Sequence, residues 1–189
     1  NKTWTILSGK ETLNPTKGFI WEAYLKSGFF SCKAEDSYNV EKDKGYLNVN
    51  LWDIISLIHQ SDPDITKSSA GRLCVEAITF FPTLLLNEGT IVREIDAQTL
   101  EVSLPIGQEL CLLTIYLKES GAIKEITTKR WGNFQDQEKF AYLPYKITVY
   151  ETQEFEGFTI PSKLSATWHY NSVDSSECLL FNITEATYK

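Results

Sequence analysis

Apolar and polar residues alternate with a period of two along most of the chain. This pattern is typical of strands that bury one face and expose the other. It predicts about ten strands, at residues 18–25, 29–39, 46–55, 90–96, 99–105, 109–118, 122–131, 145–152, 158–170 and 177–188. Gly121 and Gly157 lie in short connections between them, where glycine adopts a positive φ at little cost. Short connections of this kind favour an antiparallel meander over βαβ units.

One segment, between Asp62 and Leu86, departs from the period of two. Its apolar residues recur at spacings of three and four, as on an amphipathic helix: Ala70, Leu73, Cys74, Ala77 and Phe81. Asp62 before Pro63 is typical of a helix start, and Pro82 ends the helix. We therefore predict a single α+β domain over residues 1–189, mostly β, in which one main helix packs on one antiparallel sheet.

The predicted strand 109–118 is apolar on both faces. Leu110, Leu112 and Tyr116 alternate with a second apolar set, Cys111, Leu113, Ile115 and Leu117. A strand of this kind is expected to be covered on both sides. The helix is one candidate cover. The other is a second sheet layer, a curved-over edge of the sheet, or a ligand, and the sequence leaves these three open.

Charge and hydropathy exclude several classes of partner. The net charge is −7, and the basic residues are scattered among acidic ones, so nucleic acid and anionic membranes are not expected partners. No apolar run is long enough for direct membrane insertion. The chain starts at Asn1 and contains no Met, so we expect it to be a trimmed piece of a longer protein.

The cysteines do not form a recognisable metal or redox motif. The four residues are far apart and contain no C-x-x-C pair: Cys32, Cys74, Cys111 and Cys178. Each has apolar neighbours, so we predict four reduced, buried thiols. A disulfide is compatible with the sequence but is not indicated by it.

No catalytic motif surrounds the residues that usually carry chemistry. Only His59 and His169 are present, and neither belongs to a hydrolase, metalloprotease or nucleotide-binding pattern. We therefore expect no cofactor, no metal and no catalytic residue. An enzyme that uses Asp36 and Glu76 as acid and base remains an alternative, which requires the two carboxyl groups to meet in one pocket with separated pKa values.

Asp36 is the most unusual polar residue in the pattern. It shares a strand face with apolar neighbours such as Phe30 and Tyr38, so its carboxylate should be buried beside a cation or a donor. Arg72 on the helix and Arg130, next to Trp131, are the candidate partners. Such a pair could fix the helix to the sheet, or it could grip a polar headgroup at a cavity mouth. The third alternative is a β-bulge that exposes Asp36. Arg72 and Glu76 are also one helical turn apart.

Four segments, in order, resemble an uncharacterised bacterial family: GFIWEAYL, EDSYNVEKDKGYL, AGRLCVEAITFFPTLLL and YETQEFEGFTIPSKLSATWHY. The positions that carry the likeness are Trp21, Asp36–Tyr38, Gly45, Arg72, Glu76, Pro82, Gly157, Pro161 and Trp168. The resemblance covers nearly the whole chain. It implies a layout similar to lipoprotein carriers of the LolA and LolB type: a strongly curved sheet, or half-barrel, with a helix closing an apolar concave side that binds acyl chains. It also points to the bacterial envelope.

These observations predict a non-enzymatic binding domain for an apolar or lipid-like ligand held between the curved sheet and the helix. The residues expected at the ligand site are Trp21, Asp36, Tyr38, Arg72, Glu76, Arg130 and Trp131. The alternative is a packed structural or protein-interaction module without a small-molecule ligand. The protein partner, if there is one, cannot be read from the sequence.

Overall fold

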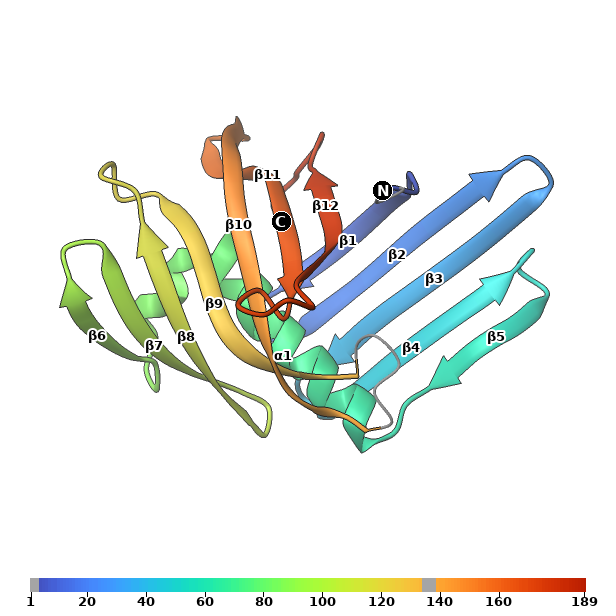
Figure 1. Ribbon diagram of the computed structural model, residues 1–189, viewed down its shortest axis with the longest axis horizontal. Helices are drawn as coiled ribbons and strands as arrows, with labels where there is room; N and C mark the ends of the chain where they lie inside the picture. The colour runs from blue at the N-terminus through green and yellow to red at the C-terminus, as the bar shows by residue number, and fades with distance from the viewer. Residues whose placement is uncertain (1–3, 134–138) are drawn as a thin grey trace.

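Two antiparallel sheets and one α-helix form the described part of the protein (Figure 1). The computed structural model describes residues 4–133 and 139–189. The five-stranded sheet has the order β1-β2-β3-β4-β5 and the seven-stranded sheet the order β12-β11-β10-β9-β8-β7-β6. Each sheet is therefore a meander, in which neighbours in the sheet are also neighbours in sequence.

The five-stranded sheet comes from the N-terminal third of the chain. Its strands are β1 (Ser8–Asn14), β2 (Gly18–Ser27), β3 (Phe30–Asn39), β4 (Lys44–Leu51) and β5 (Ile55–Gln60). The seven-stranded sheet follows the helix. Its strands are β6 (Ile91–Asp96), β7 (Thr99–Ile106), β8 (Glu109–Leu117), β9 (Ile123–Gly132), β10 (Ala141–Phe155), β11 (Phe158–Trp168) and β12 (Ser176–Asn182).

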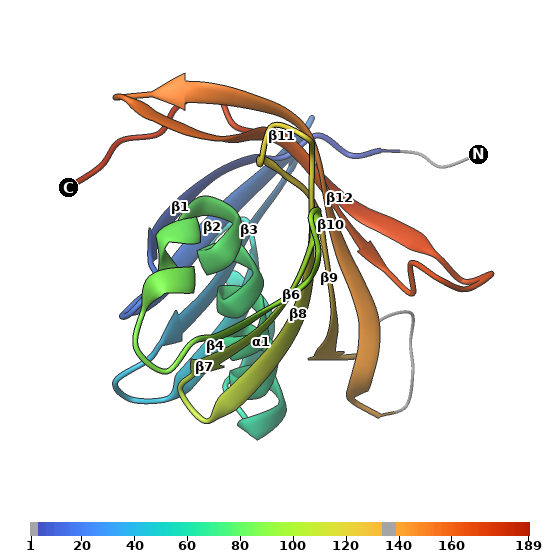
Figure 2. The same cartoon turned by 90° about the vertical axis from the view of Figure 1, so that its left-hand side faces the viewer.

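The helix α1 (Pro63–Phe80) connects the two sheets and lies against both (Figures 1 and 2). Its start is as predicted: the Asp62 carboxylate accepts a hydrogen bond from the backbone N–H of Ile65 at 3.0 Å, and Pro63 occupies the first turn. A 3-10 helix, η1 (Pro82–Leu86), continues from its end. The first turns of α1 pack very closely on β4, where a Cβ added to Gly45 would lie 2.8 Å from the Cα of Thr66.

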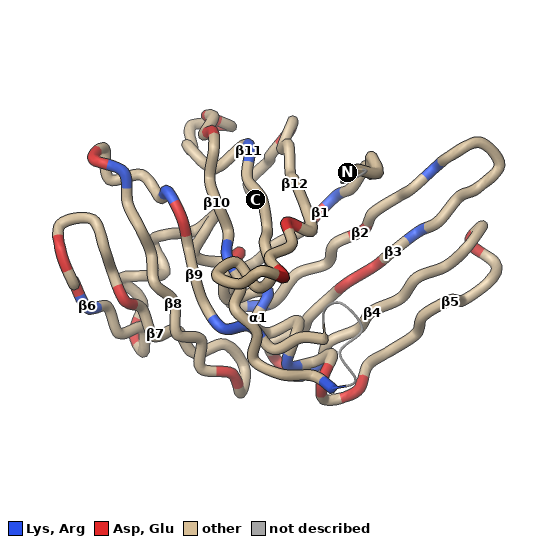
Figure 3. Tube along the Cα trace, viewed as in Figure 1, with Lys and Arg blue, Asp and Glu red and all other residues tan. Residues whose placement is uncertain are grey.

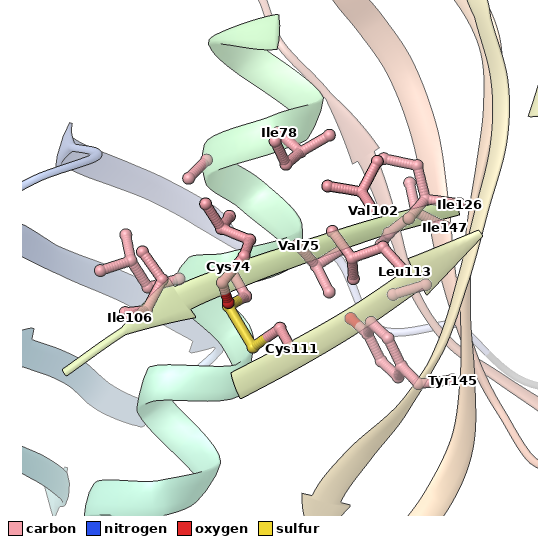
Figure 4. Close-up of a cluster of buried hydrophobic side chains, with 14 of the residues drawn as sticks. Cys74, Val75, Ile78, Val102, Ile106, Cys111, Leu113, Ile126, Tyr145 and Ile147 are labelled. Atoms are coloured by element: carbon pink, nitrogen blue, oxygen red, sulfur yellow. A yellow bond between two sulfur atoms is a disulfide. The ribbon is translucent and has the colours of Figure 1, made fainter. Parts of the chain in front are cut away.

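The main core lies between α1 and the inner face of the seven-stranded sheet (Figure 4). On the helix, Leu73, Cys74 and Ile78 are fully buried. They face buried side chains of five strands, among them Val102, Leu113, Ile115, Ile126 and Ile147. A disulfide joins Cys74 to Cys111 of β8, with 6.4 Å between the two Cα atoms. This corrects the prediction of four reduced thiols: because α1 crosses β8, two cysteines separated by 37 positions meet, and only Cys32 and Cys178 remain as thiols.

The sheet arrangement differs from the single sheet of about ten strands that the sequence pattern predicted, and from the one strongly curved half-barrel that the resemblance implied. The strands divide into sheets of five and seven, because α1 interrupts the meander and each half pairs only with itself. Two strands, β1 and β5, were not predicted. The segment 46–55 does not run on as one strand: Trp52 and Asp53 adopt φ values of 51° and 56°, which reverse the chain into β5.

The strand β8 is covered on one face only. Its inner residues Cys111, Leu113 and Ile115 are buried beneath α1. On the outer face, Leu110 and Leu112 are 61% and 66% exposed. Among the described residues, neither a second sheet layer nor a curved-over edge covers this face, so its apolar side chains lie on the protein surface. A ligand as the outer cover stays a prediction.

Candidate functional site

Arg72 of α1 is the centre of a buried ionic cluster. Its Nε donates to Glu76 Oε1 at 2.8 Å, its Nη1 to Asp36 Oδ2 at 2.8 Å and its Nη2 to Glu11 Oε1 at 3.0 Å. Asp36 also accepts a hydrogen bond from Ser69 Oγ at 3.1 Å. We name the four charged residues Glu11, Asp36, Arg72 and Glu76 the Arg72 cluster. The predicted pairing of Asp36 with Arg72 is confirmed, and it ties β1 and β3 to the helix.

Two aromatic rings of β2 cover the guanidinium group. The Arg72 Cζ lies 4.6 Å from the ring centroid of Phe19 and 5.1 Å from that of Trp21. Its side chain is 11% exposed, compared with 22% for Glu11 and 16% for Asp36. The rings add cation–π attraction and remove the guanidinium from water, so its ion pairs lie in a medium of low polarity.

Three carboxyl groups share this one cation, and the pKa of one of them, Glu11, is shifted. Burial, followed by the repulsion of Glu76, raises the pKa of Glu11 from 4.5 to about 9, although Arg72 opposes the shift. Glu76 Oε2 is buried without a hydrogen-bond partner in the described structure. A protonated Glu11 carboxyl would supply the donor that this oxygen lacks. Burial alone would lower the pKa of Arg72, but Glu76, Glu11 and Asp36 outweigh it and raise the pKa, so Arg72 stays charged.

The register of the five-stranded sheet explains why these residues meet. Glu11 of β1 lies opposite Trp21 of β2, and Trp21 lies opposite Asp36 of β3, so all three point to the same face. Arg72 and Glu76 are one turn apart on α1, which crosses that face. Glu11 and Asp36 thus lie in one row of the sheet, and Arg72 and Glu76 of the helix lie against that row.

Beyond this row, the same face of the five-stranded sheet is apolar and only partly covered. Directly opposed residues form its rows: Leu25, Cys32, Leu51 and Ile55 in one, and Ala34, Val49 and Ile58 in another. Phe30, Ile55 and Ile58 are 44%, 47% and 38% exposed, and the others are half-buried. We name this surface the apolar shelf; it consists of Leu25, Phe30, Cys32, Ala34, Val49, Leu51, Ile55 and Ile58. The strand β5 that borders it carries no charged residue (Figure 3).

The seam between α1 and the seven-stranded sheet is filled by side chains. The cavity found there encloses about 10 Å³ and is lined by residues that include Gly71, Cys111, Leu113 and Arg130. That volume is at the lower limit for a single water molecule. The space expected between helix and sheet thus contains packed side chains, whereas the shelf offers open apolar area.

The remaining predicted site residues lie apart from the Arg72 cluster. Tyr38 is buried next to Phe19, and its hydroxyl donates to Asp43. Burial and the neighbouring Asp43 carboxylate raise the pKa of Tyr38. Tyr38 thus belongs to the hydrophobic core, and its place at a ligand site stays a prediction.

Arg130 and Trp131 lie on β9, among partners that do not belong to the Arg72 cluster. Arg130 donates to the backbone oxygen of Ser68 at 3.3 Å from two of its nitrogens, and it covers the rings of Tyr145 and Trp168. Trp131 Nε1 donates to Asp64 at 2.9 Å. Of the seven predicted residues, four therefore converge: Trp21, Asp36, Arg72 and Glu76.

Sequence reasoning missed Glu11 and Phe19. Glu11 belongs to β1, whose polar sequence SGKETLN gives little hydrophobic signal. The turn residues Asn14-Pro15-Thr16-Lys17-Gly18, followed by the clear strand β2, were the available indication of a hairpin that would place Glu11 opposite Trp21.

The described residues contain neither a group suited to a metal ion nor a helix suited to span a membrane. Within 4–133 and 139–189, no three His, Cys, Asp or Glu side chains form a group suited to a metal ion. In the Arg72 cluster the guanidinium occupies the position between the carboxyl groups where a metal would have to lie. No helix in this part of the chain has the length and apolar character needed to cross a membrane.

Comparison with known proteins assigns a family. Residues 1–176 match the model of DUF6544, described as a family of unknown function. No curated protein and no solved structure matches the chain. Nothing in these comparisons tests the likeness to lipoprotein carriers, which stays a prediction. Because the match spans most of its length, the chain belongs to the DUF6544 family.

Proposed function

We propose that this domain is a non-enzymatic binding module that holds an extended apolar or lipid-like ligand on the apolar shelf. The observation that supports the proposal is that one face of the five-stranded sheet carries successive rows of apolar residues, which α1 leaves partly exposed. Contiguous apolar surface of this kind on a soluble domain marks sites of ligand or partner binding. Burial of such surface contributes about 25 cal/mol per Å², so a ligand that covers several shelf residues gains substantial affinity.

The shelf is favoured over the helix–sheet seam that the sequence suggested. The seam would have to lose its packing of Leu73, Cys74 and Ile78 to admit a ligand, whereas the shelf residues are already accessible. The Arg72 cluster bounds the shelf at its inner end, because Asp36 is two residues from Ala34 on the same strand face. An amphiphilic ligand could place its apolar part on the shelf and its polar end against the Arg72 cluster.

A packed structural or protein-interaction module is the second candidate. The filled helix–sheet seam favours it, since the domain needs no ligand to complete its main core. In that case the shelf would be covered by a protein partner instead of a small molecule.

The test uses two lysine substitutions on opposite faces of the same sheet. A neutral, environment-sensitive naphthylamine dye is titrated into the protein, and we expect a fluorescence increase with a dissociation constant of about micromolar order. Ile55→Lys places a charge on the shelf and should abolish the increase. Ile20→Lys is the matched control, because Ile20 is 52% exposed on the other face and Ile55 is 47% exposed.

Two results would contradict the shelf as the ligand site. One is equal dye binding by the two lysine variants. The other is the absence of any dye response, together with organic extracts of the purified protein that contain no lipid; this pair would leave the structural or interaction module as the better assignment.

A further inference from the structure

We propose that the ligand of the apolar shelf is a cationic amphiphile, whose ammonium end lies against the carboxyl groups of the Arg72 cluster. This inference rests on the proposed function and specifies the chemical class of its ligand. It follows from the charge of the cluster, from its place at the end of the shelf and from the side chains that remain accessible there.

The cluster contains more negative than positive charge. Three carboxyl groups contact the single guanidinium of Arg72, at 2.8, 2.8 and 3.0 Å. If Glu11 is protonated, the ionised Asp36 and Glu76 against one Arg72 still leave one negative charge. A cationic ligand group would neutralise this remaining negative charge, whereas an anionic group would increase it.

The accessible side of the cluster is the acidic side. Glu11 and Asp36 are 22% and 16% exposed at their side chains, and they come from β1 and β3. Arg72 is less exposed and lies beneath the rings of Phe19 and Trp21. A group approaching along the sheet from Ala34 therefore reaches carboxyl oxygens before it reaches the guanidinium.

Trp21 adds a second attraction for a cation. Its ring is half-buried on β2, opposite both Glu11 and Asp36, in the same row as these carboxyl groups and next to the first row of the shelf. Indole faces attract ammonium groups, and alkylated ammonium groups are bound in this way between aromatic rings. The ligand's tail would then lie over Ala34, Val49 and Leu51, along the two apolar rows.

The proton on Glu11 makes the binding of a cation measurable as proton release. The charged groups that face Glu11 are Asp36 from β3 and Arg72 and Glu76 from α1, and the ring of Trp21 from β2 is uncharged. Burial, followed by the repulsion of Glu76 and Asp36, raises its pKa to about 9, so Glu11 is protonated at neutral pH. An ammonium group placed beside it favours the ionised form, and binding should therefore release a proton.

The experiment compares three amphiphiles with the same tail and different ends: decylammonium, decanol and decanoate. Each displaces the neutral naphthylamine dye from the wild-type protein at neutral pH, below its micelle concentration. We expect decylammonium to bind about tenfold more tightly than decanol, equal to about 1.4 kcal/mol, and decanoate to bind most weakly. Calorimetry in two buffers of different ionisation enthalpy should show proton release with decylammonium only.

Three isosteric variants locate the effect. Glu76→Gln removes one negative charge and should abolish the preference for decylammonium over decanol. Glu11→Gln should keep the preference, because Glu11 is neutral at this pH, but should lose the proton release. Glu22→Gln is the matched control: Glu22 pairs with Lys33 at 2.8 Å on the opposite face, so this variant should behave as wild type.

The outcomes separate the two proposals. Displacement by all three amphiphiles with equal affinity, or a preference that survives Glu76→Gln, would overturn the cationic ligand and leave the shelf as a binding site. If the dye binds but none of the three displaces it, the cationic ligand is likewise overturned. If no dye binds and the organic extracts contain no lipid, the shelf is not the site and both proposals are wrong.

Discussion

The two sheets differ in how completely α1 covers their inner faces. Over the seven-stranded sheet, the helix and the Cys74–Cys111 disulfide form a closed core that includes Leu113 and Ile115. Over the five-stranded sheet, α1 reaches only the end that contains Gly45, and the apolar rows beyond the Arg72 cluster remain accessible. A helix of 18 residues is about 27 Å long, so it cannot cover two sheets of this size.

Because of this difference in coverage, the same types of apolar residue serve folding in one sheet and are available for binding in the other. Leucine, isoleucine and valine line both inner faces, and they are spaced alike along the strands. Under α1 they stabilise the fold by burial. On the shelf they contribute less to folding, because they keep part of their contact with water, and that exposed area is available for binding.

The largest expected effect contrasts an arginine in the seam with an arginine on the shelf. Leu73 has no exposed surface, so Leu73→Arg should lower the unfolding free energy by about 4 kcal/mol or more, enough to leave the protein without a cooperative thermal transition. Ile58→Arg, at a residue that is 38% exposed, should keep the transition within a few degrees. A comparable loss in both variants would show that the shelf is as much a part of the core as the seam.

Removal of the disulfide should weaken the helix contact with one sheet only. The double variant Cys74→Ala, Cys111→Ala should lose about 2–4 kcal/mol of unfolding free energy, because the unfolded chain is no longer cross-linked. Hydrogen exchange should rise in β7 to β9 more than in β2 and β3. Thiol titration of the denatured, unreduced protein should give two thiols, from Cys32 and Cys178; four would mean that the bridge is not formed.

The smallest expected effect, measured over a single pH unit, concerns pH and the Arg72 cluster. In the unfolded chain Glu11 ionises near its usual pKa of 4.5, whereas in the folded protein burial and Glu76 raise that pKa to about 9. Between these values the folded state keeps a proton that the unfolded state has lost. The unfolding free energy should therefore fall with rising pH, by up to about 1.4 kcal/mol per unit, and this contribution is fully present below pH 4.5.

Urea titrations of wild type and Glu11→Gln across this pH range measure the effect. The variant should lack the slope that Glu11 contributes, so its stability relative to wild type should rise with pH. Parallel pH curves for the two proteins would show that the Glu11 carboxyl is not protonated in the folded state at neutral pH.

The fold was largely predictable from local pattern. Strong alternation identified most of the strands, and the change of period with Asp62, Pro63 and Pro82 identified α1. The polar sequence of β1 and the Trp52-Asp53 reversal before β5 lack these signals, so both strands were missed. The division into two sheets depends on which strands pair, and a period of two carries no information on pairing partners.

The site was predictable only where one residue broke the pattern. Asp36 interrupts an apolar strand face, and this anomaly led correctly to Arg72. Glu11 lies on a strand with no such face, and the disulfide depends on the crossing of α1 over β8, which no spacing of cysteines encodes. The filled seam was equally inaccessible, because packing is a property of side chains that are distant in sequence.

The meander order of both sheets has a consequence for synthesis on the ribosome. Every strand pair joins neighbours in sequence, so each hairpin can close as soon as its second strand has emerged. The sheet β1–β5 can therefore form before α1 leaves the exit tunnel, at a stage when the helix does not yet cover Gly45 and Phe19. The disulfide between Cys74 and Cys111 can form only after β8 has also been synthesised. During that interval the nascent chain exposes both faces of its first sheet, the stage at which chaperone contact would matter most.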